Sequence, residues 1–311
     1  FLRDGGYYFA LSEYVDLALT GEIYTKGSWG LSARSAYRKR YKYSGNFNAS
    51  LLTTILGDKV VPTEYSKSKD FKITWTHSQD AKANPYRSFS ASVNFATSSY
   101  DRNQLTNIYN QNSTSNTKGS SVSLSQRFPN SPFSLSATMN VNQRSRDSSI
   151  SVTLPDVSIT MSRIYPFKRK HAVGSEKWYE KISMSYSGYL RNSIDTKENK
   201  LMQSSLVKDW RNGMQHNIPI SATFTFLKYI NISPSFNYTE RWYTSKVMQA
   251  WNETSNRLMP SDTIYGFNRV YNYNASLSAS TTMYGFYKPL PFLGNKVEMI
   301  RHRFEPSISL S

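Results

Sequence analysis

Hydrophobic and polar residues alternate along much of the chain with a period of two. The segment from Val15 to Ile23 shows the pattern plainly, with Leu17, Leu19, Gly21 and Ile23 following Val15 at every second position. The positions between them hold Asp16, Ala18, Thr20 and Glu22. Successive side chains of a strand point to opposite faces of its sheet, so this segment predicts a strand with one apolar and one polar face. No helical period persists for three turns anywhere in the sequence.

The clearest hairpin is predicted between Asn217 and Tyr243. Apolar residues occupy every second position from Ile218 to Phe226, and again from Ile230 to Tyr238. A turn made of Leu227, Lys228 and Tyr229 would place all of them on one face, because an odd-length turn preserves the alternation. The predicted pairs are Phe226 with Ile230, Phe224 with Ile232, Ala222 with Pro234, Ile220 with Phe236, and Ile218 with Tyr238.

Similar alternation recurs and predicts roughly 13 to 15 strands, many of about 10 residues. The paired segments include 29–37 with 47–55, 71–75 with 89–95, and 133–141 with 150–154, and further strands lie at 182–188 and 271–279. Long polar connections are predicted from Asp58 to Asp70, from Tyr100 to Gly119 and from Trp251 to Tyr265.

The composition of the polar faces separates two classes of β protein. These faces carry mostly Ser, Thr and Asn, whereas the charged residues gather in the connections and Tyr and Trp gather at strand ends. A soluble β-sandwich or β-helix, the alternative, usually carries many Lys and Glu on its solvent face. The pattern favours an all-β, antiparallel transmembrane β-barrel of the outer membrane whose apolar side chains face lipid. No run of about 18 apolar residues is present, so a membrane-spanning helix is not expected.

Composition and charge bear mainly on the binding partners of the protein. The chain of 311 residues has no Cys, and its 38 Lys and Arg against 21 Asp and Glu give a net charge of +17. Such a charge permits an acidic polymer or an anionic membrane surface as a partner. The basic run Arg38, Lys39, Arg40 and Lys42 is a candidate for contact with phosphorylated lipid, and a solvated turn is the alternative. Nucleic acid is not expected as a partner, because basic and aromatic residues are not interleaved on one exposed strand face.

No catalytic constellation is found. The four histidines are scattered singly, and neither an HExxH motif, a phosphate-binding glycine loop nor a GxSxG motif occurs. We therefore expect a protein that is not an enzyme and that has no metal and no cofactor.

A resemblance to a known family makes the prediction specific. The segments "FLRDGGYYFALSEYVDLALTGEIYTKGSWG", "YRKRYKYSGN", "TLPDVSITMSRIYPF" and "RHRFEPSISLS" resemble the outer-membrane proteins that assemble lipopolysaccharide. This family is also called the organic-solvent-tolerance family, and the sequence looks like its Bacteroidetes branch. The resemblance covers nearly the whole chain in order.

The resemblance implies a transporter in the outer membrane of a Gram-negative bacterium. Family members join a periplasmic jellyroll to a barrel of about 26 strands that is plugged by an outer-membrane lipoprotein. Lipopolysaccharide arrives from a periplasmic bridge protein and enters the outer leaflet between the first and last strands. Residues 1–311 would be the N-terminal part of the barrel, roughly half of it, without the jellyroll and the closing strands. A nutrient-uptake barrel, either a porin or a plugged energy-coupled receptor, is the alternative function.

The resemblance also assigns candidate residues. The lateral gate, where the first strand would meet the last, is assigned to Gly5, Gly6, Tyr7, Tyr8, Phe9 and Ala10. The alternative is an ordinary strand of a closed barrel with a glycine-rich beginning. Asp16, Thr20 and Glu22 are candidates for lining the lumen. Better-known members carry prolines near this seam, whereas this chain has Gly5, Gly6 and Gly21 there. Glycine also weakens strand pairing. Those members also carry disulfides between jellyroll and barrel. This chain has no Cys that could form them.

Overall fold

The computed structural model describes residues 2–60, 62–103, 117–171, 174–253, 256–288 and 299–311. Within these ranges it contains 17 strands, two short α-helices and a short 3-10 helix. The first strands are β1 (Leu2–Ser12), β2 (Val15–Ile23), β3 (Trp29–Lys39), β4 (Tyr43–Leu56), β5 (Ser66–Gln79), β6 (Arg87–Ala96), β7 (Thr117–Arg127), β8 (Phe133–Arg144) and β9 (Ser149–Ile164). They are followed by β10 (Ser183–Lys197), β11 (Arg211–Ser221), β12 (Phe224–Phe226), β13 (Ile230–Asn252), β14 (Arg257–Thr281), β15 (Met283–Tyr287), β16 (Ile300–Phe304) and β17 (Ser307–Leu310). The helices are α1 (Tyr100–Asn103), η2 (Trp178–Lys181) and α2 (Glu198–Leu201).

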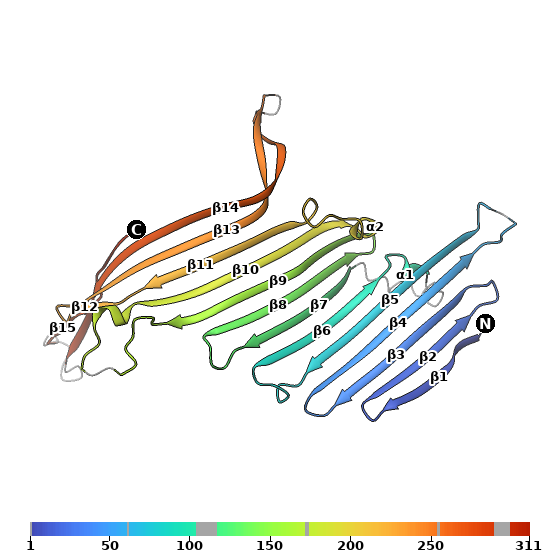
Figure 1. Ribbon diagram of the computed structural model, residues 1–311, viewed down its shortest axis with the longest axis horizontal. Coiled ribbons are helices and arrows are strands. Elements are labelled where there is room, and N and C mark those ends of the chain that lie inside the picture. The colour runs from blue at the N-terminus through green and yellow to red at the C-terminus, as the bar shows by residue number, and fades with distance from the viewer. Residues whose placement is uncertain (1, 61, 104–116, 172–173, 254–255, 289–298) are drawn as a thin grey trace. The chain divides into compact units, whose positions relative to one another are not determined.

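Fifteen strands form one sheet, and from β1 to β11 each strand lies beside its neighbours along the chain. Its order is β1-β2-β3-β4-β5-β6-β7-β8-β9-β10-β11-β13-β14-β17, with β12 paired to β13, while β15 and β16 form a separate pair. Figure 1 shows β1 to β8 side by side in chain order, with the N-terminus at the outer edge. Such a meander needs only hairpin connections, which fits the antiparallel strands predicted from the sequence.

The predicted hairpin is confirmed. Phe226 pairs with Ile230 and Phe224 with Ile232, and the Ala222 amide donates to the Pro234 carbonyl (3.1 Å). The Thr239 hydroxyl donates to the Asn217 side chain (3.0 Å) at the position that the same register requires. Leu227 and Lys228 adopt φ values of 49° and 63°. These left-handed conformations close the short turn between two twisted strands.

The predicted connection from Trp251 to Tyr265 is wrong. β13 continues to Asn252 and β14 begins at Arg257, so most of this segment lies in strands. Two antiparallel strands can satisfy each other's backbone groups beyond the clean hydrophobic alternation. The connection after Asp58 is shorter than predicted, because β5 begins at Ser66. In the connection after Tyr100, residues 100–103 form α1, and 104–116 lie outside the described residues.

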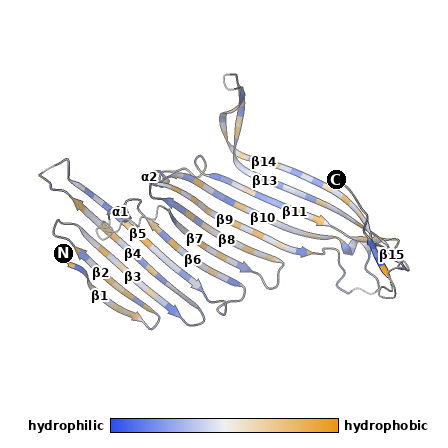
Figure 2. Ribbon diagram, turned by 180° about the vertical axis from the view of Figure 1, so that it is seen from behind, coloured by the Kyte–Doolittle hydropathy of each residue, from blue (hydrophilic) through white to orange (hydrophobic). Residues whose placement is uncertain are grey.

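The apolar and polar positions of neighbouring strands lie in register. Leu31 of β3 pairs with Leu51 of β4, which pairs with Phe71 of β5. One residue further on, Ser32 pairs with Ser50 and Ser50 with Lys72. Figure 2 shows hydrophobic and hydrophilic residues interleaved along these strands. We call the face of Leu31 the apolar face and the opposite one the polar face.

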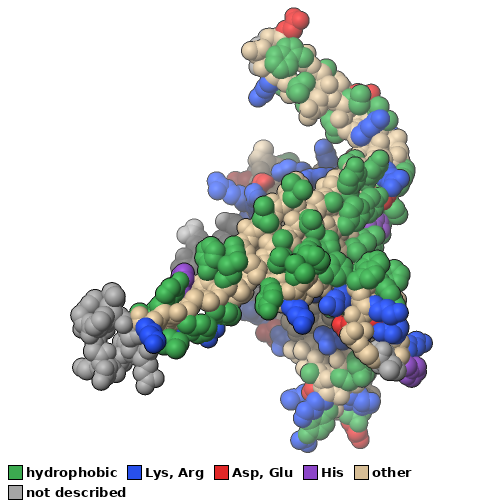
Figure 3. Space-filling model, turned by 90° about the vertical axis from the view of Figure 1, so that its left-hand side faces the viewer, with side chains coloured by type: hydrophobic (Ala, Val, Ile, Leu, Met, Phe, Trp, Pro, Cys, Tyr) green, Lys and Arg blue, Asp and Glu red, His purple; other side chains and the backbone are tan. Residues whose placement is uncertain are grey.

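The structure divides into two compact units. The first comprises residues 1–158, 189–213 and 244–266, and the second 159–188, 214–243 and 267–311. In the first unit Tyr100 of α1 is buried with Leu52 and Ala96, and a second cluster contains Val141, Ile150, Val152 and Ile194. Many large hydrophobic side chains stay exposed, among them Leu31 (50%) and Leu51 (54%) of the apolar face. On the face of the molecule seen in Figure 3, hydrophobic side chains form several exposed patches, and Lys and Arg gather in separate groups.

No helix among the described residues is long and apolar enough to cross a membrane.

Candidate functional site

The edge strand β1 carries all six residues predicted for the gate. Among the described residues it pairs with β2 alone, and every residue from Leu2 to Ser12 is exposed. Tyr7 is 78% exposed and Leu11 is 61% exposed. An open edge presents unpaired backbone donors and acceptors and normally invites another strand. We call this feature the β1 edge.

The pairing of β1 with β2 divides the three predicted aromatic residues between two faces. Tyr7 pairs with Leu19 and Phe9 with Leu17, so both aromatic rings lie on the apolar face. Tyr8 pairs with Ala18 and therefore lies on the polar face, together with Asp16. The resemblance assigns Tyr7, Tyr8 and Phe9 to the gate as one group, whereas alternation along the strand separates Tyr8 from the other two.

The pairing is irregular at both ends of β1. The register shifts by one residue between Leu2 and Gly5, and again between Ala10 and Ser12. Asp4, next to the first shift, has a φ of 57°. A non-glycine residue in this region is uncommon, and a bulge leaves its extra residue outside the ladder of hydrogen bonds. Only the middle of β1, from Gly5 to Ala10, therefore pairs regularly.

Gly6 lies in closer contact with its neighbour than the other glycines of this site. A Cβ on Gly6 would lie 1.9 Å from the Leu19 carbonyl oxygen, which belongs to the facing strand. A Cβ on Gly5 or Gly21 would meet no atom closer than 3.6 Å. Glycine is therefore required at position 6 by the close approach of two backbones. At positions 5 and 21 the structure leaves room for a side chain.

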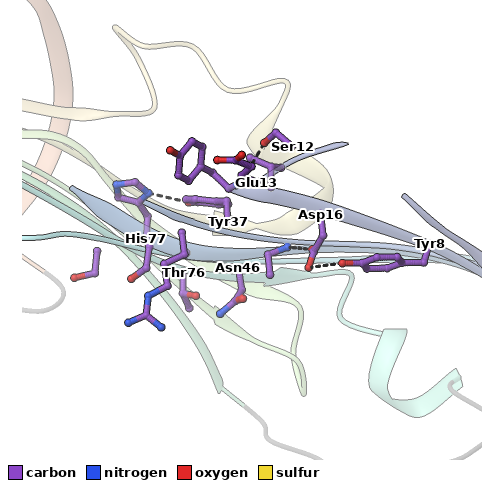
Figure 4. Close-up of a pocket in the computed structure, with 15 residues that line it drawn as sticks. Tyr8, Ser12, Glu13, Asp16, Tyr37, Asn46, Thr76 and His77 are labelled. Atoms are coloured by element: carbon purple, nitrogen blue, oxygen red, sulfur yellow. Dashed lines mark hydrogen bonds between the residues drawn. The ribbon is translucent and has the colours of Figure 1, made fainter. Parts of the chain in front are cut away.

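Asp16 joins three strands on the polar face. Its Oδ1 accepts a hydrogen bond from the Ala36 amide of β3 (2.7 Å), and its Oδ2 accepts one from the Tyr8 hydroxyl of β1 (3.3 Å). Figure 4 shows the carboxylate between these two donors. A side chain thus takes the place of a backbone acceptor at this point of the sheet, and the first strand is held through it.

The other two predicted lumen residues also lie on the polar face. Thr20 pairs with Gly6 on one side and Ser32 on the other. Glu22 pairs with Gly30, accepts a hydrogen bond from the Tyr24 hydroxyl (3.0 Å) and lies 4.0 Å from the Arg3 guanidinium. The structure therefore brings all three predicted residues to one face of β2, beside β1.

A cavity of about 580 Å³ adjoins the end of β1. Its lining includes Tyr8, Asp16, Glu13, Tyr37 and His77, which Figure 4 labels. The Tyr37 hydroxyl lies 2.8 Å from Nδ1 of His77 and accepts a hydrogen bond from the Trp75 indole (2.8 Å). Tyr37, Trp75 and His77 therefore form a packed aromatic cluster and not a pair of a nucleophile and its general base. No group of three or more acidic, His or Cys residues that could hold a metal ion occurs in the described part of the chain.

The four predicted lipid-phosphate residues lie at one rim but point to different surroundings. Arg38 and Lys39 end β3, and Arg38 lines the cavity beside Asp16. Lys39 lies over the Tyr14 ring (4.9 Å) and Arg40 over the Tyr41 ring (4.8 Å). Lys42 lines a different pocket. The run is therefore not one site.

Polar and ionic contacts that the sequence does not predict join α1 to the strands β5 and β7. Asp70, 3% exposed, accepts hydrogen bonds from the Thr97 hydroxyl (3.0 Å) and the Asn103 amide (2.8 Å). The ammonium group of Lys118, whose side chain is 3% exposed, lies 2.7 Å from the Asp101 carboxylate. These groups are far apart along the chain, and no local pattern announces them. They fix the connection that leads out of β6.

Comparison with known proteins decides the family. A family model described as LptD protein matches residues 1–311, which is the whole chain. The chain belongs to the LptD family. No curated protein matches the chain.

LptD proteins are outer-membrane β-barrels of Gram-negative bacteria that act in lipopolysaccharide transport and assembly. The sequence resemblance and the predicted fold class are confirmed. The antiparallel sheet of fifteen strands agrees with this fold class, and the chain belongs to a transport and assembly family and not to an enzyme family. Membership of the family implies lipopolysaccharide as the substrate and other components of its transport as partners.

Proposed function

We propose that the β1 edge is one side of a lateral gate through which lipopolysaccharide leaves the barrel for the outer leaflet. The other side would be the closing strand of the barrel. Residues 1–311 would then be the N-terminal part of the barrel, with the periplasmic jellyroll and the closing strands contributed by other parts of the protein. The reaction is a transfer between environments, without covalent chemistry, and its free energy is supplied elsewhere.

The division of β1 into two unlike faces carries the proposal. Tyr7 and Phe9 present exposed apolar surface on one face, while Tyr8 and the neighbouring Asp16 of β2 present polar groups on the other face. Lipopolysaccharide has the same division, because its acyl chains are apolar and its sugars are strongly hydrated. A gate at this edge would leave the acyl chains beside Tyr7 and Phe9 and the sugars beside Asp16, Thr20 and Glu22.

The energetics of the strand support opening at this edge. An antiparallel pair is held by its ladder of backbone hydrogen bonds, and β1 loses part of that ladder at both register shifts. Gly5 and Gly6 contribute no side chain to cross-strand packing, which is the main source of sheet stability. These irregularities lie in the pairing of β1 with β2, but a bulge also bends and twists its own strand. The ladder that β1 could form with a closing strand would therefore be regular only over a short stretch.

Two partners follow from the same proposal. An outer-membrane lipoprotein would plug the lumen, and a periplasmic bridge protein would deliver lipopolysaccharide to it. The surrounding outer-membrane lipids would receive the acyl chains as they pass Tyr7 and Phe9.

Locking the seam tests the gate. One cysteine replaces Phe9 and a second replaces the residue that faces it on the closing strand of the full-length protein. Residues 1–311 contain no Cys, so this half of the barrel adds no competing thiol. Oxidation should stop delivery of lipopolysaccharide to the cell surface, and a reducing agent should restore it.

The matched control locks two strands that the proposal keeps together. Leu19 pairs with Ala33 between β2 and β3, so a Leu19→Cys/Ala33→Cys pair crosslinks the interior of the sheet. This variant should deliver lipopolysaccharide normally after oxidation. Normal delivery by a fully crosslinked seam would rule the gate out. Loss of nutrient uptake instead of surface lipopolysaccharide on depletion would favour a nutrient-uptake barrel.

A further inference from the structure

We propose that a pocket on the strands β4 to β7 binds an anionic phosphorylated lipid of the membrane. The pocket has a volume of about 570 Å³ and lies within the first compact unit. It is lined by Lys42, Tyr43, His77, Gln79, Ala83, Asn84, Arg87, Phe89 and Leu124. We call it the rim pocket. The proposal rests on the outer-membrane location of the family and not on the gate.

Two cations of the rim pocket are available for a phosphate. Lys42 and Arg87 are both exposed, and neither has an ion-pair partner among the described residues. The acidic residue nearest to Arg87 in the sequence is Asp80, and its Oδ1 accepts a hydrogen bond from the Lys82 backbone amide (2.8 Å). An anionic headgroup would supply the missing charge.

More positive charge surrounds the pocket. The Lys82 ammonium lies 5.2 Å from the centre of the Tyr41 ring, and the Arg40 guanidinium lies 4.8 Å from it. Both cations are held by the aromatic ring and not by a carboxylate. The Asp80 amide donates to the Lys42 carbonyl (2.9 Å), which ties the two connections together at this rim.

Aromatic and aliphatic side chains form the other wall of the pocket. The rings of Tyr43 and His77 are stacked with centroids 6.0 Å apart, and those of His77 and Phe89 are 5.2 Å apart. Phe89 pairs directly with Leu124, and both are half-buried. These residues belong to the apolar face, which in this family faces the hydrocarbon of the membrane. An acyl chain would lie against this wall.

The connection that supplies Arg87 is organised without any ligand. The Asn84 side chain accepts the Tyr86 amide (2.8 Å), and the Gln79 amide group donates to the Arg87 carbonyl (3.0 Å). The backbone that carries Arg87 is therefore held in place before a ligand binds, which lowers the cost of ordering it. A free phosphate ion would use the cations but leave the apolar wall bare, so the combination favours a lipid.

Lipid retention by the full-length protein tests the proposal. The protein is purified in a neutral detergent with equal amounts of phosphatidylglycerol and phosphatidylcholine that carry the same acyl chains. Retained lipid is counted by native mass spectrometry. The wild-type protein should retain phosphatidylglycerol preferentially. A Lys42→Gln/Arg87→Gln variant should lose this preference by on the order of tenfold, because each cation near a membrane surface contributes noticeably to anionic lipid binding.

A control variant removes the same charge elsewhere. Lys59 and Lys208 are exposed in other connections, and Lys59→Gln/Lys208→Gln should retain phosphatidylglycerol as the wild type does. Folding of all variants is checked by the shift in gel mobility that a folded barrel shows on heating. Equal retention by the two double variants would overturn the proposal. Complete displacement of the lipid by inorganic phosphate would also overturn it, because the site would then be a phosphate site.

Discussion

Single residues at the β1 edge differ in a way that only the structure reveals. Gly5, Gly6 and Gly21 are equivalent in the sequence, as glycines in or beside a weak strand pair. In the structure only Gly6 lies where a Cβ would meet a backbone carbonyl at 1.9 Å. The reason is the register of β1 on β2, which places Gly6 opposite Thr20. A sequence pattern does not report such a distance between backbones.

Substitution of Gly6 should therefore destabilise the barrel, whereas substitution of Gly21 should not. Gly6→Ala pushes β1 away from the Leu19 carbonyl, and overpacking of this kind costs about 1–3 kcal/mol. Gly21→Ala meets only ordinary contacts (3.7 Å) and removes backbone entropy of the unfolded chain, which stabilises by about 0.5–1 kcal/mol. Heat-dependent gel mobility measures the thermal midpoint of the folded barrel. The midpoint should fall for Gly6→Ala and rise for Gly21→Ala. An equal midpoint for both variants would contradict the close approach at Gly6.

The buried carboxylate Glu180 predicts a pH dependence outside the strands. Its side chain, 1% exposed, accepts hydrogen bonds from the Arg169 guanidinium (2.7 Å) and the Lys177 amide (2.7 Å). These donors, the Arg169 side chain above all, lower the pKa of Glu180 from 4.5 to about 2. A lowered pKa in the folded state stabilises above the unfolded pKa, and that stabilisation is lost as the pH falls towards the folded pKa.

The connection between β9 and β10 should thus loosen between about pH 4.5 and pH 2. Amide hydrogen exchange in residues 174–182, corrected for the intrinsic rate, measures the effect. Glu180→Gln should raise exchange already at neutral pH and remove the pH dependence. Glu176→Gln is the matched control, because Glu176 is half-exposed and pairs with Lys168 (3.1 Å) at the surface. If Glu176→Gln has the same effect, the buried pair is not the cause.

At the scale of the element, the sequence predicts best those strands in which apolar and polar residues alternate without interruption. The hairpin at Leu227 to Tyr229 was predicted to the residue, because two clean runs of alternating residues leave a single turn length that aligns both faces. The extension of β13 to Asn252 and of β14 back to Arg257 was missed. Alternation becomes irregular there, and backbone pairing continues without it. Strand ends follow hydrogen bonds, whereas the sequence pattern reports only the partition of side chains.

Asp16 should couple the first three strands through one side chain. Asp16→Ala leaves the Ala36 amide without its acceptor, and an unsatisfied amide of this kind costs about 1–3 kcal/mol. Asp16→Asn keeps a side-chain oxygen in place and should cost less than half as much. Tyr8→Phe removes only the long hydrogen bond (3.3 Å) and should have little effect. Thermal midpoints rank the variants, and hydrogen exchange at Ala36 reports the lost acceptor. An Asp16→Asn variant as unstable as Asp16→Ala would contradict this role.

At the scale of the whole molecule, the sequence predicts the two faces of the sheet but not what closes over them. Neutral side chains such as Asn48 and Thr74 fill the polar face of β4 and β5, and a strand face of this composition is typical of a water-filled lumen. The network of Asp70, Asp101 and Lys118 could not be predicted, because its members meet through a connection and not along a strand. Of the two cations that line the rim pocket, the sequence predicts contact with lipid phosphate for Lys42 alone, since Arg87 lies outside the basic run.

The two faces predict opposite chemical accessibility at neighbouring residues. Asn48 pairs with Arg34 and Thr74 on the polar face, and Ala49 pairs with Ala33 and Ile73 on the apolar face. In the membrane-inserted full-length protein, with any cysteines outside residues 1–311 replaced, Asn48→Cys should react with a charged maleimide that cannot enter lipid. Ala49→Cys should stay unlabelled, because its thiol would lie in hydrocarbon that excludes the charged reagent. Both variants should label equally after denaturation, which controls for the reactivity of the thiols. Labelling of Ala49→Cys with protection of Asn48→Cys in the membrane would reverse the two faces, and with them the side of β1 on which acyl chains pass.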